Sequence, residues 1–191
     1  VNDLLEIDLR DLLGRESVKP NNELFKKNIY NKVVMVTGAG GSIGSELALQ
    51  ILNQKPKILL LLDLSEAALY QVLRKVEEVA VNKSIEIRTI LGSVTDQQLM
   101  AKIFKSSPID TVYHTAAYKH VPLIEANIMQ GMKNNINGTK IVSTLAGEFK
   151  IRNFILISTD KAVNPTNYMG ASKRISELIC LEQETKYPGT K

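Results

Sequence analysis

Short apolar runs alternate with segments of helical periodicity along most of this chain, and this alternation constrains the fold more than any other feature. Five runs rich in β-branched and aliphatic residues are predicted to be strands: residues 33–36, 58–62, 85–91, 111–115 and 152–157. Helices are predicted between and after them: one ending at Leu52, one capped by Ser65, one capped by Thr95, and two over residues 129–148 and 169–186. Strands that are apolar at nearly every position need cover on both faces. The pattern therefore predicts an α/β fold with a doubly wound parallel sheet.

The 191 residues are enough for one domain with a substantial core. Residues 1–31 have no strong period, apart from a short helical turn expected at residues 11–15 and a turn at residues 20–22. They are predicted to form an N-terminal arm that packs on the main domain, residues 32–191. A doubly wound sheet usually continues after the last helix predicted here. We therefore expect the last strands of the sheet to be missing from this sequence.

Composition narrows the classes of protein to which this chain can belong. The net charge is +4, but lysine and arginine are scattered and tryptophan is absent, which argues against nucleic-acid binding. Cys180 is the only cysteine, so an internal disulfide and a cysteine metal cluster are excluded, and a reducing compartment is favoured. Its apolar neighbours place Cys180 in the predicted core. No apolar run approaches the roughly 20 residues of a membrane span.

A glycine-rich loop joins the first predicted strand to the first predicted helix. Gly38, Gly41 and Gly44 fit the pattern T-G-x-x-G-x-x-G, with Ser42 and Ile43 between the last two glycines. Glycine permits a tight turn and lets backbone N–H groups approach a pyrophosphate, while the helix N-terminus faces the negative charge. A glycine pattern alone can also indicate an ordinary turn that binds no ligand. Here strand, loop, helix, second strand and a terminal acid follow in order, which is typical of a Rossmann-like dinucleotide-binding domain.

The terminal acid is Asp63, 19 residues after Gly44 at the end of the second predicted strand. A carboxylate at this place can accept hydrogen bonds from the ribose hydroxyls of NAD and would repel the 2′-phosphate of NADP. NAD is therefore favoured over NADP. Alternatively, Asp63 caps the helix that follows it, since Ser65 is close by.

The chemistry is expected in residues 158–173, which follow the fifth predicted strand. Thr159, Asp160 and Lys161 supply a hydroxyl, a carboxylate and an ammonium in succession, and Lys173 returns a second cation from the next helix. The carboxyl ends of parallel strands are where doubly wound folds bind and transform ligands. The alternative is a polar end of a strand with a solvated ion pair.

Several segments resemble the extended short-chain dehydrogenase/reductases, and more narrowly the nucleotide-sugar 4,6-dehydratases of bacterial polysaccharide biosynthesis. They are residues 11–15 (DLLGR), 34–46 (VMVTGAGGSIGSE), 114–122 (HTAAYKHVP), 134–139 (NNINGT), 158–165 (STDKAVNP) and 169–173 (MGASK). Met169 stands where the family usually has its catalytic tyrosine, as in the large membrane-anchored members. Tyr168 lies one residue away, a turn of about 100° on a helix, and so cannot simply replace it.

The resemblance implies a role for each of these residues. Lys161 is the base at sugar C5 and Asp160 the acid at C6, which needs a pKa raised by burial. Thr159 forms a hydrogen bond with the C4 oxygen, and Lys173 forms one with the nicotinamide ribose. Because Met169 has no proton to exchange, Asp160 is expected to take the C4 hydroxyl proton, directly or through Thr159 or water.

Further candidates flank these segments. Ser93 and Val94 are expected near the adenine, and Ala116 and Ala117 are small enough for the backbone to approach the cofactor. Lys119, His120, Asn135 and Asn167 are candidates for the substrate side. Lys119 and His120 can instead be exposed loop residues, and Asn135 an ordinary helix residue or one that holds the active-site backbone. His114 is expected to be a hydrogen-bonded residue at a strand end, because no partner ligands for a metal are found.

The resemblance implies an NAD-dependent lyase that converts UDP-N-acetylglucosamine to a 4-keto-6-deoxy sugar nucleotide. A nucleotide-sugar epimerase of the same superfamily and a non-catalytic NAD-binding module are the alternatives. The resemblance further implies a homo-oligomeric parent, with N-terminal helices in the bacterial inner membrane and a cytoplasmic catalytic domain. The C-terminal substrate region would lie beyond this sequence.

Overall fold

The computed structural model describes residues 21–80 and 85–191. Its core is a parallel five-stranded sheet with the strand order β3-β2-β1-β4-β5. The strands are β1 (Val33–Thr37), β2 (Ile58–Asp63), β3 (Glu86–Leu91), β4 (Thr111–His114) and β5 (Asn153–Leu156). All five lie within one residue or two of the predicted runs, and the predicted α/β fold class is confirmed. The strand order reverses between β1 and β4, where doubly wound folds bind ligands.

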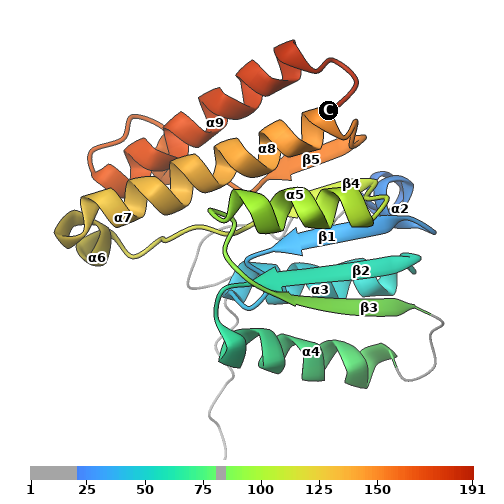
Figure 1. Cartoon of the computed structure of the whole chain (residues 1–191). Coiled ribbons are helices and arrows are strands. Elements are labelled where there is room, and N and C mark those ends of the chain that lie inside the picture. The colour runs from blue at the N-terminus through green and yellow to red at the C-terminus, as the bar shows by residue number, and fades with distance from the viewer. Residues whose placement is uncertain (1–20, 81–84) are drawn as a thin grey trace, which may run out of the picture.

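Helices cover both faces of the sheet (Figure 1). They are α2 (Asn22–Ile29), α3 (Ser42–Asn53), α4 (Glu66–Ala80), α5 (Gln97–Ser106), α6 (Val121–Ala126), α7 (Ile128–Met132), α8 (Gly138–Glu148) and α9 (Tyr168–Lys186). On one face, Val34 and Val36 pack with residues of α2, α3 and α4. On the other face, Met35 packs with residues of α5 and α8. Successive residues of a strand point to opposite faces, which is why a central strand such as β1 is apolar throughout.

The structure corrects two details of the predicted helices. The cap of α5 is Asp96, whose carboxylate accepts a hydrogen bond from the Leu99 N–H, and not Thr95. The helix predicted over residues 129–148 is a composite, because a π-helical turn (Lys133–Asn137) separates α7 from α8. Such a turn leaves no trace in the apolar period, so the sequence pattern did not reveal it.

The described part of residues 1–31 includes helix α2, which the sequence pattern did not predict. Asn21 caps this helix, Ile29 is fully buried, and the ring of Phe25 meets that of Tyr113 edge-on at 6.3 Å. The turn expected at residues 11–15 lies outside the described residues, as does Pro20. The domain boundary at residue 31 stays a prediction. In the described chain, no helix combines the length and the hydropathy that a bilayer span requires.

Candidate active site

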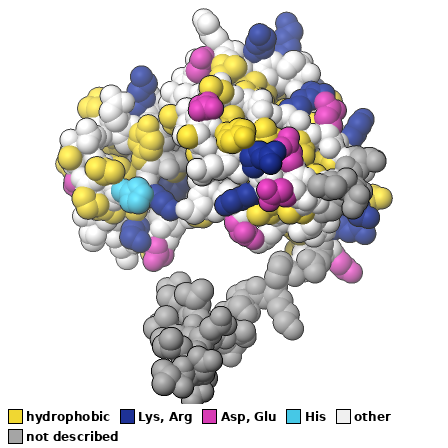
Figure 2. Space-filling view, turned by 90° about the horizontal axis from the view of Figure 1, so that it is seen from below, with side chains coloured by type: hydrophobic (Ala, Val, Ile, Leu, Met, Phe, Trp, Pro, Cys, Tyr) yellow, Lys and Arg dark blue, Asp and Glu magenta, His cyan; other side chains and the backbone are white. Residues whose placement is uncertain are grey.

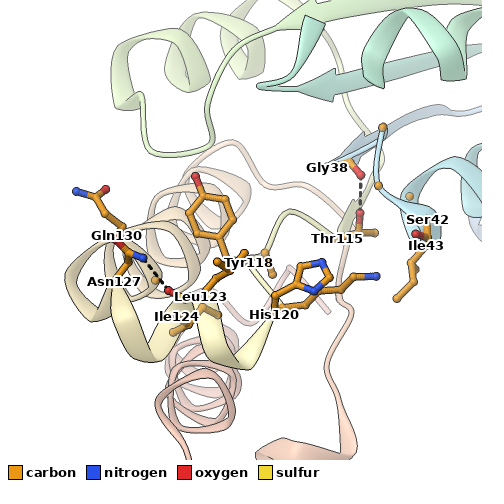
Figure 3. A pocket seen from close by; sticks show the side chains of 16 residues that line it. Gly38, Ser42, Ile43, Thr115, Tyr118, His120, Leu123, Ile124, Asn127 and Gln130 are labelled. Atoms are coloured by element: carbon orange, nitrogen blue, oxygen red, sulfur yellow. Dashed lines mark hydrogen bonds between the residues drawn. The ribbon is translucent and has the colours of Figure 1, made fainter. Parts of the chain in front are cut away.

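Two adjoining cavities lie over the carboxyl ends of the strands. The larger, of ≈ 610 Å³, lies between the glycine loop and helices α6 and α7 (Figure 3). The smaller, of ≈ 340 Å³, extends over the ends of β2 and β3. Residues that line both are Gly38, Gly40, Gly41, Thr115, Ala117 and Tyr118. The two cavities therefore form one groove that passes over the glycine loop.

The glycine loop is shaped by close packing against Thr115 and Ala116, which directly follow β4. Gly38 has φ +67°, and a Cβ there would lie 2.6 Å from the Ala116 Cα. A Cβ on Gly44 would collide with the Gly38 carbonyl oxygen and with the Thr115 hydroxyl. Gly41 precedes α3 without any side-chain cap, so the first N–H groups of the helix are left for another partner. This cradle, with Ser42 and Ile43 on its rim, fits an anionic group such as a pyrophosphate.

Asp63 is bonded to the glycine loop as well as to its own turn. One carboxylate oxygen accepts from the Gly40 N–H at 2.9 Å, and the other accepts from the Ser65 N–H at 2.9 Å. From the sequence, a ribose contact and a cap of the following helix were the alternative roles for Asp63. The Ser65 hydroxyl caps α4, as predicted, because it accepts from the Ala68 N–H at 3.3 Å. Asp63 is therefore not the cap of this helix, and it lines the smaller cavity, where its ribose role stays a prediction. Gly40 was not among the predicted site residues. A Cβ there would lie 2.5 Å from the Ala68 Cβ, a contact that the sequence pattern does not reveal.

The other residues expected near the adenine are only partly in place. Val94 is buried and lines the smaller cavity, together with Ala116 and Ala117. Ser93 does not line it: its hydroxyl is bonded to the Thr95 hydroxyl at 2.8 Å and accepts from the Thr95 N–H. The neighbouring Gly92 lines the cavity in its place.

A buried polar network connects the sheet to α9. His114 is hydrogen-bonded to the hydroxyls of Thr37, at 2.7 Å from Nδ1, and Thr139, at 3.1 Å from Nε2. Burial, with a smaller contribution from the charge of Lys173, lowers the pKa of His114 to about 3. The Thr139 hydroxyl donates to the Asn135 carbonyl, so it accepts from Nε2–H of a neutral imidazole. The prediction of a hydrogen-bonded strand-end histidine is confirmed.

Asn135 holds the backbone of Tyr118. Its side-chain oxygen accepts from the Tyr118 N–H at 2.8 Å, and its side-chain nitrogen donates to the Tyr118 carbonyl and to the Ser172 hydroxyl. The π-helical turn leaves the Asn135 carbonyl to the hydroxyls of Thr139 and Ser176. The amide of Asn135 is buried and bonded to protein groups, which is the arrangement expected for the backbone-holding alternative.

Tyr118, which no sequence motif singled out, lines both cavities. Lys119 and His120 line the larger cavity from exposed positions, as Figure 3 shows for His120. Asn167, expected on the substrate side, caps α9 instead: its side-chain oxygen accepts from the Gly170 N–H at 2.8 Å. It lines neither cavity, because the cap turns its side chain toward the helix.

Thr159, Asp160 and Lys161 form a short turn after β5. The Thr159 hydroxyl donates to Asp160 at 2.9 Å, and the Lys161 ammonium lies 3.6 Å from the same carboxylate. The Asp160 side chain is 78% exposed. The hydrogen bond from Thr159 and the charge of Lys161 lower the pKa of Asp160. The expectation that burial raises the pKa of Asp160 is therefore wrong for the described residues, because they leave this carboxylate exposed to solvent. None of the three lines either cavity.

Lys173 and Met169 lie on the first turns of α9, and both are buried. The Lys173 ammonium donates to the Ile157 carbonyl at 2.6 Å, and burial lowers the pKa of Lys173. Tyr168 is exposed, and its N–H donates to Glu125 on α6. The two neighbours thus face different surroundings, as the helical offset predicted, and the Tyr168 phenol does not occupy the place of the Met169 side chain.

The expectation for Cys180 needs a correction. The thiol is half-buried in a small groove beside α8 and the C-terminal residues, and its neighbour Leu178 is exposed. The apolar period of α9 did not reveal this, because β5 is an edge strand and leaves that side of the helix open. Among the described residues, no group of three or more His, Cys, Asp or Glu side chains is arranged to hold a metal ion.

The fold and the groove define a Rossmann-like protein with the glycine loop of a dinucleotide-binding domain. The chain belongs to the family described as "Polysaccharide biosynthesis protein", whose sequence model matches residues 34–190. The capsular polysaccharide biosynthesis protein CapD of Staphylococcus aureus is 40% identical over 179 residues, which are 94% of this chain and 30% of CapD. A UDP-N-acetylglucosamine 4,6-dehydratase (inverting) of Campylobacter jejuni is 33% identical over 153 residues, 79% of this chain and 43% of that protein. The resemblance to extended short-chain dehydrogenase/reductases of the nucleotide-sugar dehydratase branch is confirmed.

Solved structures agree with the fold. Pen from Bacillus thuringiensis superposes with a TM-score of 0.77 at 27% identity, over 86% of this chain and 51% of that chain. A UDP-glucose 4-epimerase from Bifidobacterium longum, solved with NAD+ and UDP, has a TM-score of 0.72 at 23% identity, over 82% of this chain and 50% of that chain. The chain thus spans between 30% and 51% of the length of these relatives.

Proposed function

We propose that this chain is the NAD-binding part of a nucleotide-sugar 4,6-dehydratase, with UDP-N-acetylglucosamine as the substrate and a UDP-4-keto-6-deoxy sugar as the product. The observation that carries the proposal is the position of the Thr159-Asp160-Lys161 turn at the carboxyl end of β5. The glycine loop also lies at the carboxyl ends of the strands. Lys173 of α9 donates a hydrogen bond to the Ile157 carbonyl, directly after β5. The named dehydratase relative supports the substrate class.

The chemistry assigned to these residues is proton transfer at C5 and at the hydroxyl oxygens on C4 and C6. A bound nicotinamide would accept the hydride from sugar C4 and return it to C6. Lys161 removes the C5 proton, which the C4 ketone has made acidic, and Asp160 protonates the departing C6 hydroxyl, so that water leaves and a C5–C6 double bond forms. When the hydride adds to C6, Lys161 returns to C5 a proton that has exchanged with solvent. Thr159 hydrogen-bonds the C4 oxygen, and Asp160 is the first acceptor of the C4 hydroxyl proton because Met169 cannot take it. Lys119 and His120, at the larger cavity, face the anionic part of the substrate.

A nucleotide-sugar epimerase is the second candidate, and epimerases among the similar structures favour it. Simple C4 epimerisation needs no acid at C6, so the Asp160-Lys161 pair would have no task. A non-catalytic NAD-binding module is the third candidate. It would bind the cofactor and leave UDP-sugars unchanged.

One incubation distinguishes the three. The full-length protein is given UDP-N-acetylglucosamine in deuterated water, and the product is examined by NMR and mass spectrometry. A dehydratase yields a 4-keto-6-deoxy sugar that carries solvent deuterium at C5. An epimer without deuterium would support the epimerase, and unchanged substrate in the presence of bound NAD would support the binding module.

Selectivity for NAD over NADP is proposed to rest on Asp63. Asp63→Asn removes the negative charge that repels a 2′-phosphate, while its remaining oxygen still accepts from one backbone N–H. We expect NAD affinity to fall by about tenfold, as for the loss of a charge-assisted hydrogen bond, and NADP affinity to rise relative to NAD. Calorimetric titration of the 191-residue chain with both cofactors measures the ratio. An unchanged ratio would contradict the assignment.

A further inference from the structure

Helix α9 holds the end of β5 by two hydrogen bonds from residues one turn apart. Lys173 donates to the Ile157 carbonyl at 2.6 Å, and Glu177 accepts from the Ser158 hydroxyl at 2.6 Å. Ile157 and Ser158 are the two residues directly before Thr159. The position of the Thr159-Asp160-Lys161 turn therefore depends on contacts made by both Lys173 and Glu177.

Glu177 uses both carboxylate oxygens. Oε1 accepts from Ser158, and Oε2 accepts from the Arg174 guanidinium at 2.8 Å. These two hydrogen bonds lower the pKa of Glu177, so its carboxylate is charged at neutral pH. Arg174 is half-exposed and makes its ion pair within one turn of α9, so it does not anchor the strand end itself.

The charge of Glu177 also matters for the buried Lys173. Three titratable groups interact with this ammonium: His114 from β4, and Glu177 and Cys180 from α9. Burial lowers the pKa of His114 to about 3 and raises the pKa of Cys180 to about 11, so both are neutral at pH 7. Among these three groups, Glu177 is the one that carries a negative charge at pH 7, whereas a Cys180 thiolate would add its charge only at alkaline pH. Glu177 lies one helical turn from Lys173, and the two side chains bond the adjacent residues Ser158 and Ile157.

We propose that Glu177 is a positioning residue that ties the Thr159-Asp160-Lys161 turn to α9 through Ser158 and supplies a negative charge near the Lys173 ammonium. The proposal rests on the proposed function for the claim that Lys173 and the turn take part in catalysis. The contacts with Ser158 and the effect on Lys173 do not depend on it. The two tasks are separable, because the Ser158 bond needs an acceptor atom whereas the effect on Lys173 needs a charge.

Two substitutions separate them. Glu177→Gln keeps an acceptor for Ser158 and removes the charge, whereas Ser158→Ala removes the hydrogen bond and keeps the charge. Glu182→Gln is the matched control, because it removes the same charge from an exposed position on the same helix. Glu177→Asp keeps the charge with a shorter reach and is the charge-conserving control. Glu177→Ala removes the charge together with the acceptor, and replaces Glu177→Gln in the titration if Glu177→Gln does not fold. Circular dichroism and thermal melts establish that each variant is folded.

The first readout is the titration of Lys173, followed by NMR in the 191-residue chain labelled at lysine Cε and assigned with Lys173→Arg. Removing a nearby anion disfavours the ammonium, so the midpoint for Lys173 should move to lower pH in Glu177→Gln. It should stay at its wild-type value in Ser158→Ala, Glu177→Asp and Glu182→Gln. An unchanged midpoint in Glu177→Gln, or an equal shift in Glu182→Gln, would overturn the electrostatic role.

The second readout is turnover of UDP-N-acetylglucosamine by the full-length protein. Ser158→Ala should lower kcat by about tenfold with little change in KM, as for the loss of one hydrogen bond to a charged group. In Glu177→Gln, the alkaline limb of the pH profile should move to lower pH together with the Lys173 midpoint. A wild-type kcat in Ser158→Ala would overturn the positioning role. If the wild-type protein is inactive while the NMR shift is observed, the proposed function fails and the electrostatic role of Glu177 stands.

Discussion

Replacement of Lys161 by methionine is expected to lower dehydration by the full-length protein by about 10²- to 10⁴-fold, the usual contribution of a general base. Methionine keeps the length of the side chain and removes the group that takes the C5 proton. Lys161 is exposed and lines neither cavity, so NAD affinity and thermal stability should stay close to wild type. Turnover, NAD titration and a thermal melt of the same variant measure the three quantities.

Deuterium incorporation at C5 tests directly whether Lys161 is the base. If Lys161 is the base at C5, Lys161→Met should lose deuterium incorporation at C5 and leave the oxidation at C4 possible, so that reduced cofactor accumulates. Lys105→Met, at an exposed position in the last turn of α5, is the control and should turn over normally. Wild-type deuterium incorporation in Lys161→Met would assign the base elsewhere.

The strands could be predicted from the sequence because each is a local pattern with a strong physical cause. A strand in the middle of a parallel sheet is buried on both faces, so β1 and β2 are continuous apolar runs. The glycine loop could be found for a related reason. Gly38 needs a positive φ and Gly44 a close backbone approach, and only glycine meets both needs cheaply.

Contacts between distant segments could not be predicted in the same way. Gly40 is fixed by Asp63, 23 residues away, and Tyr118 by Asn135, 17 residues away. Neither pair is visible in a periodic pattern. Asn167 and Asp96 show a different difficulty, because a polar residue before a helix can be a cap, a ligand-binding group or a loop residue, and local sequence does not distinguish these roles.

The exposure of Asp160 depends on the tertiary structure. A general acid at C6 needs a raised pKa, but among the described residues the partners of Asp160 are Thr159 and Lys161, and both lower its pKa. Within the proposed function, burial of this carboxylate must come from the substrate or from protein beyond the described residues. Asp160 is then matched to its task only in the assembled site, and in the 191-residue chain it should titrate below the ordinary pKa of an aspartic acid.

The second large effect is expected from Gly41→Ala in the glycine loop, which should weaken NAD binding. Gly41 has an extended backbone with φ −69°, and a Cβ there meets one atom, the Gly38 carbonyl oxygen at 3.3 Å. The fold should therefore tolerate alanine at a cost of about 1 kcal/mol for the poorer helix cap, or about 2–4 °C in Tm. The same methyl group would project into the groove where the backbone must approach a pyrophosphate. We expect NAD affinity to fall by about 100-fold or more, from lost contacts with the first N–H groups of α3.

Alanine substitutions at two other glycines serve as controls for this prediction. Gly189→Ala adds a methyl group that meets nothing within 4 Å, and should change neither Tm nor affinity. Gly44→Ala collides with the Gly38 carbonyl and the Thr115 hydroxyl, so it should lose stability together with binding. Gly41→Ala is the informative variant because it should reduce NAD binding and leave stability nearly unchanged. Calorimetric titration with NAD and a thermal melt of all three variants provide the comparison, and wild-type affinity in a folded Gly41→Ala variant would place the pyrophosphate away from the loop.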